Sequence, residues 1–127
     1  LISGKMKVII AGGRDFNDFD LLKKTCDAVL KNVPKEQIEI VCGKAHGADY
    51  HGEQYARING YPVKYFPADW DGLGKAAGVL RNQQMADYAD ALIAFWDGKS
   101  KGTEDMIRRA GLKALKIRMK RYGNKAQ

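Results

Sequence analysis

Short apolar runs alternate with amphipathic segments along this chain. Four of the runs are predicted to be strands, at residues 7–11, 38–42, 63–66 and 91–96, and the last is short and apolar enough to be buried on both faces. A helix is expected after each of these runs. The first begins at a cap at residue 17 or 18 and the second near residue 48, while the third covers about 75 to 88 and the fourth 103 to about 110. This alternation predicts a three-layer α/β fold around a mainly parallel sheet of doubly wound type.

A fifth run has a different pattern. Its apolar and basic side chains alternate over Leu115, Lys116, Ile117, Arg118, Met119 and Lys120. A period of two with one apolar side predicts an edge strand that has one face in water. Right-handed crossovers with one reversal of winding would place the first and fourth strands side by side.

Glycine-containing turns follow the first, second and fourth predicted strands. Because the carboxyl ends of parallel strands share one edge of the sheet, the three turns should converge on one crevice. The last turn also opens a helix, whose free N–H groups and positive dipole end favour an anion. We therefore predict nucleotide or phosphate binding by Gly12, Gly13, Arg14, Gly43, Gly47, Asp49, Lys75, Arg81, Gly98, Lys99, Ser100, Gly102 and Thr103.

Several nearby residues have a structural interpretation as well as a functional one. Asp49 could cap a helix or contact a ribose hydroxyl group. Trp70 and Trp96 could stack on a base or close the core. His46 could donate to a phosphate or lie in solvent.

The basic charge is concentrated at the end of the chain. The sequence has 127 residues and a net charge of +7, but residues 106–127 contain eight Lys and Arg and no acid. We interpret residues 1–5 as a cloning remnant, 6–119 as a single domain and 120–127 as a basic tail. Such a tail is typically solvated, and binding to a nucleic-acid backbone is the alternative.

The remaining composition excludes several classes of protein. The two cysteines, Cys26 and Cys42, favour reduced, buried thiols in a cytoplasmic protein over a disulfide framework. No apolar run is long enough to cross a membrane, and no signal peptide is visible. No metal-ligand set is apparent, so any Mg²⁺ would enter with a bound phosphate.

Four motifs, in this order, carry a family resemblance. The segments 11–16, 43–49, 67–82 and 81–107 resemble the SLOG superfamily, which includes the LOG phosphoribohydrolases and DprA. The first three are similar to its small YspA-type (cpYpsA-related) branch, often found in phage and bacterial genomes. Over residues 6–119 the resemblance implies a Rossmann-like sheet of order 3-2-1-4-5, a nucleotide ligand, a phosphate-binding or catalytic Arg81 and a homodimer.

The chain departs from the LOG pattern at one position. Those enzymes carry Gly-Thr-x-x-Glu, whereas Gly102-Thr103 is followed here by Glu104, Asp105 and Met106. Met106 stands where the glutamate is expected, and a thioether can neither act as a base nor stabilise an oxocarbenium ion.

The leading hypothesis is therefore binding of a nucleotide or nucleoside-phosphate derivative, in a sensor or processing role. One alternative is hydrolysis of an N-glycosidic bond by displaced carboxylates, from Asp15, Asp69, Glu104 or Asp105. A second alternative is single-stranded DNA binding through the basic tail, as the resemblance to DprA implies.

Overall fold

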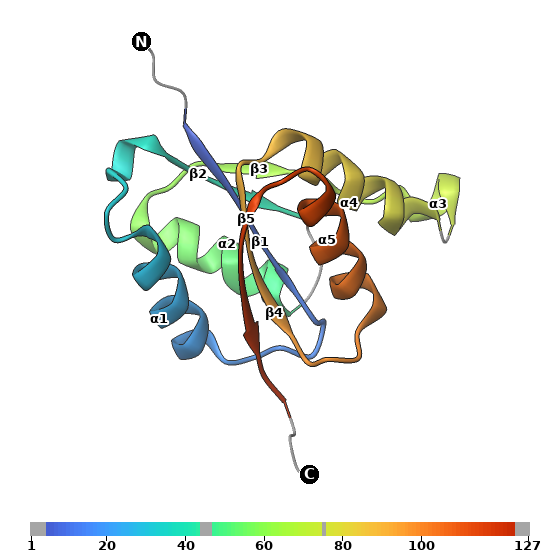
Figure 1. Cartoon of the computed structure of the whole chain (residues 1–127), viewed down its shortest axis with the longest axis horizontal. Coiled ribbons are helices and arrows are strands. Elements are labelled where there is room, and N and C mark those ends of the chain that lie inside the picture. Colours follow the sequence, from blue (N-terminus) through green and yellow to red (C-terminus); the bar gives the residue numbers. More distant parts are fainter. Residues whose placement is uncertain (1–4, 44–46, 75, 124–127) are drawn as a thin grey trace.

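Five parallel strands form one sheet in the order β3-β2-β1-β4-β5 (Figure 1). The computed structural model describes residues 5–43, 47–74 and 76–123. The strands are β1 (Met6–Gly12), β2 (Ile38–Cys42), β3 (Val63–Tyr65), β4 (Ala91–Trp96) and β5 (Lys116–Arg121). The Rossmann-like order implied by the family resemblance is confirmed, and β1 and β4 are neighbours at the centre.

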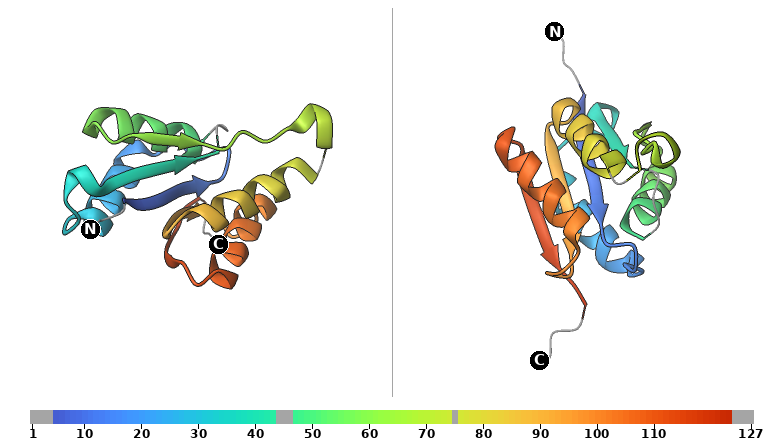
Figure 2. Two further views of the ribbon diagram at one scale, coloured as in Figure 1. Left: turned by 90° about the horizontal axis from the view of Figure 1, so that it is seen from above. Right: turned by 90° about the vertical axis from the view of Figure 1, so that its right-hand side faces the viewer.

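Two layers of helices cover the sheet, as the views in Figure 2 show. The helices are α1 (Phe19–Leu30), α2 (Ala48–Asn59), α3 (Trp70–Leu73), α4 (Ala76–Tyr88) and α5 (Lys101–Leu112), with a 3₁₀ turn η1 (Lys35–Gln37). α1 and α2 pack on one face, and α4 and α5 pack on the other. The three-layer α/β prediction is therefore confirmed.

Local sequence fixes where the helices begin and end. The side chain of Asp18 accepts a hydrogen bond from the amide of Leu21 at 3.0 Å and so caps α1. Gly60, with a φ of 75°, ends α2 in the left-handed conformation that glycine adopts without strain.

The central strands are buried on both sides. In β1, Val8 and Ile10 face the core under α1 and α2, while Ile9 and Ala11 face the core under α4 and α5. This explains why residues 8–11 are continuously apolar instead of alternating.

Three segments differ from the predictions. Residues 70–73, predicted as a loop, form α3, because the Asp69 carboxylate caps the amide of Gly72 at 3.0 Å. β5 ends at Arg121, one residue beyond the predicted edge strand, so the sheet extends into the segment 120–127 that was interpreted as a basic tail. Ile117 and Met119 are each 39% exposed, so the expected apolar face of this edge strand is only partly covered.

Within the described ranges, no helix is both long enough and apolar enough to cross a membrane.

Candidate functional site

A cavity of about 990 Å³ opens at the carboxyl edge of the sheet, where the winding reverses between β1 and β4. The turn after β1, the end of β2, the start of α5 and the α3–α4 segment all contribute to its lining. Its lining includes the predicted residues Gly12, Gly13, Arg14, Gly43, Asp49, Arg81, Ser100, Gly102 and Thr103. Gly47, Gly98 and Lys99 lie outside the lining, and Lys75 and His46 fall outside the described residues.

Close packing of the turns explains the first two glycine motifs. A Cβ atom on Gly12 would lie 2.8 Å from the Cβ of Ala48 and would also collide with the carbonyl oxygen of Phe95. Gly47 has a φ of 71°, and the next amide, that of Ala48, donates to the Gly13 carbonyl at 3.3 Å. The turns after β1 and β2 are therefore fixed against each other beside β4.

The turn after β4 is closed by its own acid. Oδ1 of Asp97 accepts hydrogen bonds from the amides of Lys99 and Ser100, both at 2.8 Å. These backbone bonds, from Ser100 and then from Lys99, hold the pKa of Asp97 below its usual value. Two amides expected to contact a phosphate are thus already used within the turn.

The first turn of α5 still offers amide groups to the cavity. Hydrogen bonding along the helix begins with the Glu104 amide, which donates to the Ser100 carbonyl at 3.1 Å. The amides of residues 101–103 precede that bond, and all three residues line the cavity. The positive end of α5 therefore faces the cavity from residues 101–103.

Arg81 reaches the cavity from α4 across two strand ends. Its Nη1 donates to the carbonyl oxygen of Gly43 and, at 3.4 Å, to that of Phe66. A Cβ atom on Gly43 would collide with this guanidinium group and lie 2.9 Å from Oδ2 of Asp49. Glycine at position 43 is thus what lets Arg81 and the largely buried Asp49 approach each other at the cavity wall.

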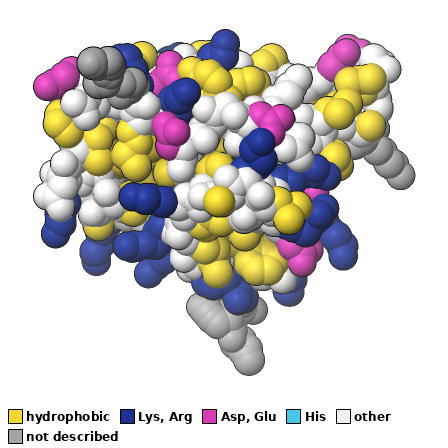
Figure 3. All heavy atoms as spheres, turned by 45° about the horizontal axis from the view of Figure 1, so that its top comes forward, with side chains coloured by type: hydrophobic (Ala, Val, Ile, Leu, Met, Phe, Trp, Pro, Cys, Tyr) yellow, Lys and Arg dark blue, Asp and Glu magenta, His cyan; other side chains and the backbone are white. Residues whose placement is uncertain are grey.

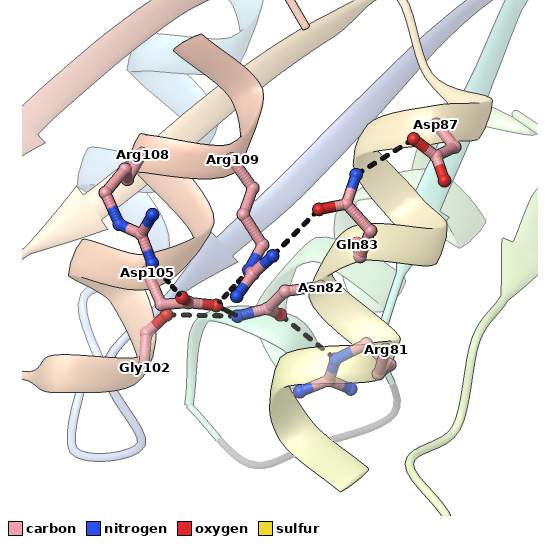
Figure 4. A network of polar contacts seen from close by, with 8 residues as sticks. All are labelled: Arg81, Asn82, Gln83, Asp87, Gly102, Asp105, Arg108 and Arg109. Carbon is pink, nitrogen blue, oxygen red and sulfur yellow. Dashed lines mark hydrogen bonds and ion pairs between the residues drawn. The ribbon is translucent and has the colours of Figure 1, made fainter. Parts of the chain in front are cut away.

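A polar network joins α4 to the first turn of α5 (Figure 4). The amide nitrogen of Asn82 donates to Oδ2 of Asp105 at 3.0 Å and to the carbonyl of Gly102 at 3.2 Å. Arg109 donates to the same Asp105 oxygen at 2.9 Å and to Gln83 at 2.8 Å. The network fixes the start of α5 relative to the helix that carries Arg81.

The state of Asp105 follows from this network. Burial alone would raise the pKa of its carboxyl group. Hydrogen bonds from Arg109 and Asn82, together with the charges of Arg109 and Arg108, outweigh burial and keep the pKa below its usual value. Asp105 is therefore ionised and has a structural role, because its carboxylate oxygens accept hydrogen bonds from Asn82, Arg108 and Arg109.

The four carboxylates considered as catalytic candidates are not brought together. Asp15 and Asp105 line the cavity, whereas Asp69 and Glu104 do not. Asp69 caps α3 and Glu104 is exposed on α5. Met106 is only 1% exposed and packs in the core beneath α4 and α5, although it also touches the cavity.

The two tryptophans have different positions. Trp70 is 49% exposed at the cavity lining, and a Cβ atom on Gly78 would lie 3.1 Å from its ring. Trp96 lies outside the lining, where its Nε1 donates to the Ser100 carbonyl at 3.0 Å. Only Trp70 is therefore placed to stack on a ligand in this cavity.

Sequence reasoning missed three residues of the site. Asp97 precedes Gly98, and such an Asp-Gly pair is a known signal for a side chain that caps its own turn. Asn82 adjoins Arg81 but gives no pattern of its own. Tyr122 follows the edge strand, and its contact with Asp15 joins residues 107 positions apart, which local patterns do not reveal.

In the described part of the chain, no three His, Cys, Asp or Glu side chains form a metal-ligand group.

The fold and the cavity at the reversal of winding define a Rossmann-like α/β domain. The chain belongs to the YspA, cpYpsA-related SLOG family, whose model matches residues 6–72. It is 36% identical over 110 residues to the gene 61 protein of Mycobacterium phage D29, covering 82% of this chain and 87% of that protein.

A solved structure has a similar fold. The X-ray structure of DNA processing protein A (DprA) from Streptococcus pneumoniae matches with a TM-score of 0.70 and 16% identity. The match covers 91% of this chain and 50% of the DprA chain, so the domain corresponds to half of that protein. The likeness shows that both chains share this fold.

Proposed function

We propose that the cavity binds a nucleotide or nucleoside-phosphate derivative. The observation that carries the proposal is the meeting of the α5 N-terminus with Arg81 in one cavity of about 990 Å³. Free amides at a helix start and a guanidinium group are both typical ligands of a phosphate. The phosphate would lie against residues 101–103, because the amides of Lys99 and Ser100 already bind Asp97.

Acidic and aromatic side chains in the same lining suit the rest of a nucleotide. Asp15 and Asp49 supply carboxylates that accept hydrogen bonds from sugar hydroxyl groups. Trp70 supplies an exposed ring for the base. A simple inorganic anion would use only the cationic part of this lining.

Binding without hydrolysis is the form of this proposal that the residues favour. Glycoside hydrolysis uses two carboxyl groups on either side of the scissile bond. Here Asp105 is held by Asn82 and two arginines, and Met106 occupies the glutamate position of the LOG pattern. The site is therefore better suited to a phage or bacterial protein that binds a nucleotide as a sensor or in a processing role than to a phosphoribohydrolase.

The partner proposed for the protein itself is a second copy of the chain. Large apolar side chains are exposed on α3 and in the first half of α4, at Trp70, Leu73, Val79 and Leu80. This arm extends from the body of the domain in Figure 2. Burying such a surface between two copies would remove it from water, beside the cavity that Trp70 and Val79 line.

The proposed ligand is tested by thermal shift against AMP, ADP, ATP, ADP-ribose, NAD and cyclic nucleotides. A ligand at 100 times its Kd should stabilise the fold by about 2.7 kcal/mol. Arg81→Lys keeps the charge and loses the planar fork, so it should weaken binding about tenfold or more. Arg57→Lys is the matched control, since Arg57 is an exposed arginine on α2 that pairs with Glu53 and lies outside the cavity lining. If no nucleotide shifts the melting temperature of the wild type, the proposal is wrong.

The proposed dimer is tested by light scattering of the eluted protein. Leu73→Ser and Leu80→Ser together should convert dimers to monomers with little change in unfolding free energy, because both side chains are already exposed. A wild-type protein that elutes as a monomer at high concentration would exclude the dimer. It would not bear on the proposal that the cavity binds a nucleotide.

A further inference from the structure

Asn82 lies in the cavity wall between the two groups that are proposed to bind a phosphate. It is 7% exposed, lines the cavity and follows Arg81 directly on α4. Its Oδ1 accepts a hydrogen bond from Nε of Arg81 at 3.3 Å, while its Nδ2 donates to the carbonyl oxygen of Gly102 at 3.2 Å and to Asp105 at 3.0 Å. Figure 4 shows the amide between the guanidinium group and the first turn of α5. One amide group therefore contacts both parts of the proposed phosphate site.

The polarity of this amide is fixed by its neighbours. A carbonyl and a carboxylate lie on the side of α5, and both are acceptors, so only the NH₂ group can face them. An N–H donor of Arg81 lies on the other side, so the amide oxygen must face it. A carboxylate at this position would lack the donors, and an apolar side chain would lack both functions. Position 82 therefore requires a short side chain that donates toward α5 and accepts from Arg81.

The same amide helps to determine which atom of Arg81 a ligand can reach. Nη1 of Arg81 donates to the carbonyl oxygens of Gly43 and Phe66, and Nε donates to Asn82. Among the described residues, Nη2 has no hydrogen-bond acceptor. Three acceptors from three segments of the chain thus hold the plane of the guanidinium group. Nη2 is the nitrogen that remains for a phosphate in the cavity.

Cohesion between α4 and α5 does not depend on this amide. Met85 of α4 shares a buried apolar cluster with Met106 and Ala110 of α5. Arg109 adds a hydrogen bond to Gln83 outside the cavity lining. A buried amide is costly unless all its hydrogen bonds are made, so an apolar side chain would serve simple helix packing better. Packing of the two helices therefore does not explain why an amide lies at this point of the cavity wall.

We infer that Asn82 is the positioning residue that makes the cavity selective for a phosphorylated ligand over its unphosphorylated counterpart. It holds Nη2 of Arg81 and the amides of residues 101–103 at a fixed separation, so that both can contact one phosphate. Both N–H groups of its amide are already used, so Asn82 acts through these two groups and is not itself a ligand. This inference rests on the proposed function and deepens it, because it names the residue on which phosphate recognition depends.

Asn82 should affect only the phosphate part of a nucleotide. The groups proposed for the sugar and the base are Asp15, Asp49 and Trp70, and none of these three forms a hydrogen bond with Asn82 in the described chain. Trp70 belongs to the α3 arm, whose exposed hydrophobic side chains lie at the upper right in Figure 3. A displacement of about 1 Å is enough to weaken a contact that needs fixed geometry. Loss of Asn82 should therefore weaken binding of AMP and spare adenosine, which has the same base and sugar.

Calorimetric titration of the full chain with AMP and with adenosine tests the inference. Asn82→Ala should lower the ratio of the two affinities about tenfold or more, with the adenosine affinity changed less than about twofold. Because Asn82 lines the cavity, water can replace the lost amide, so the fold should persist. Asn82→Ser, which keeps a small polar group, is the second variant if the first does not fold. Asn59→Ala is the matched control, since Asn59 donates to the Tyr55 carbonyl at 2.9 Å outside the cavity lining.

The outcomes separate this inference from the proposed function. A lowered ratio in the Asn82 variants, with a wild-type ratio in Asn59→Ala, supports the inference. An equal loss of AMP and adenosine affinity would show that Asn82 supports the cavity as a whole, and would overturn it. An unchanged ratio, or an equal fall in Asn59→Ala, would also overturn it. In these three cases wild type still binds AMP, so the proposed function stands. If wild type binds no nucleotide of the thermal-shift panel, both fail.

Discussion

The hydroxyl group of Tyr122 donates a hydrogen bond of 2.6 Å to Oδ1 of Asp15 and so joins the end of β5 to the turn after β1. The ring also packs edge-on against Phe16, with centroids 4.9 Å apart. Burial and the hydrogen bond to Asp15 both raise the pKa of Tyr122, so the phenol stays protonated as a donor. Tyr122, the residue after β5, therefore helps to hold Asp15 in place at the cavity lining.

Tyr122→Phe should lower the unfolding free energy by about 1 kcal/mol, because it removes one hydrogen bond and keeps the ring. It should also weaken nucleotide binding, since Asp15 loses the donor that orients it. Urea unfolding and calorimetric titration measure the two effects. Tyr88→Phe is the control: it removes a similar bond to Glu39 at the opposite edge of the sheet. Equal nucleotide affinity in both variants would show that the Tyr122 contact is structural only.

Gly43→Ala should abolish nucleotide binding without unfolding the protein. The added methyl group would collide with the Arg81 guanidinium group and lie 2.9 Å from Oδ2 of Asp49, so the arginine must move. Gly111→Ala is the control, because a Cβ atom there meets nothing within 4 Å. In the helix it should instead stabilise the fold by about 0.5–1 kcal/mol. Retention of wild-type affinity by Gly43→Ala would contradict the role given to Arg81.

Much of this fold follows from local patterns. The runs at 38–42 and 91–96 coincide with β2 and β4. The second of these is apolar throughout because it is buried on both faces. The third helix was missed because its four residues lack a helical period, and its cap at Asp69 has an equally good loop interpretation.

The site was less predictable than the fold. Glycine turns and Arg81 could be placed at one edge because parallel strands share that edge. Which amides remain free depended on the Asp97 side chain, and the partners of Asp15 and Asp105 depended on tertiary contacts with Tyr122 and Asn82. Side-chain pairing across the sheet leaves no periodic signal in the sequence.

Restoring the glutamate of the LOG pattern should not create a hydrolase here. Met106 is 1% exposed among Ile9, Met85 and Ala94, so Met106→Glu places a carboxyl group in an apolar core. We expect a loss of about 3 kcal/mol or more in unfolding free energy. Met106→Leu keeps the volume and should cost less than about 1.5 kcal/mol. Urea unfolding measures both, and release of base from AMP by Met106→Glu would contradict the expectation.

The protein should lose stability as the pH rises above about 10, where unfolded tyrosines ionise. The hydrogen bond to Glu39, together with burial, raises the pKa of Tyr88 to about 12 in the folded protein. Between these two values the unfolded chain binds fewer protons than the folded one, so the unfolding free energy falls with pH. Tyr88→Phe should flatten this dependence in urea midpoints measured from about pH 9 to about pH 11. An unchanged slope would show that Tyr88 does not contribute.

The central position of β1 has a consequence for the nascent chain. β1 pairs with β2 on one side, but its other neighbour, β4, is made only after Trp96 has been synthesised. Until then the apolar edge of Val8–Ala11 stays open, and an open apolar strand edge promotes aggregation. A fragment ending near residue 72 would retain that edge permanently and lack the β4–α5 half of the cavity, so we expect it to require a chaperone or to aggregate during synthesis.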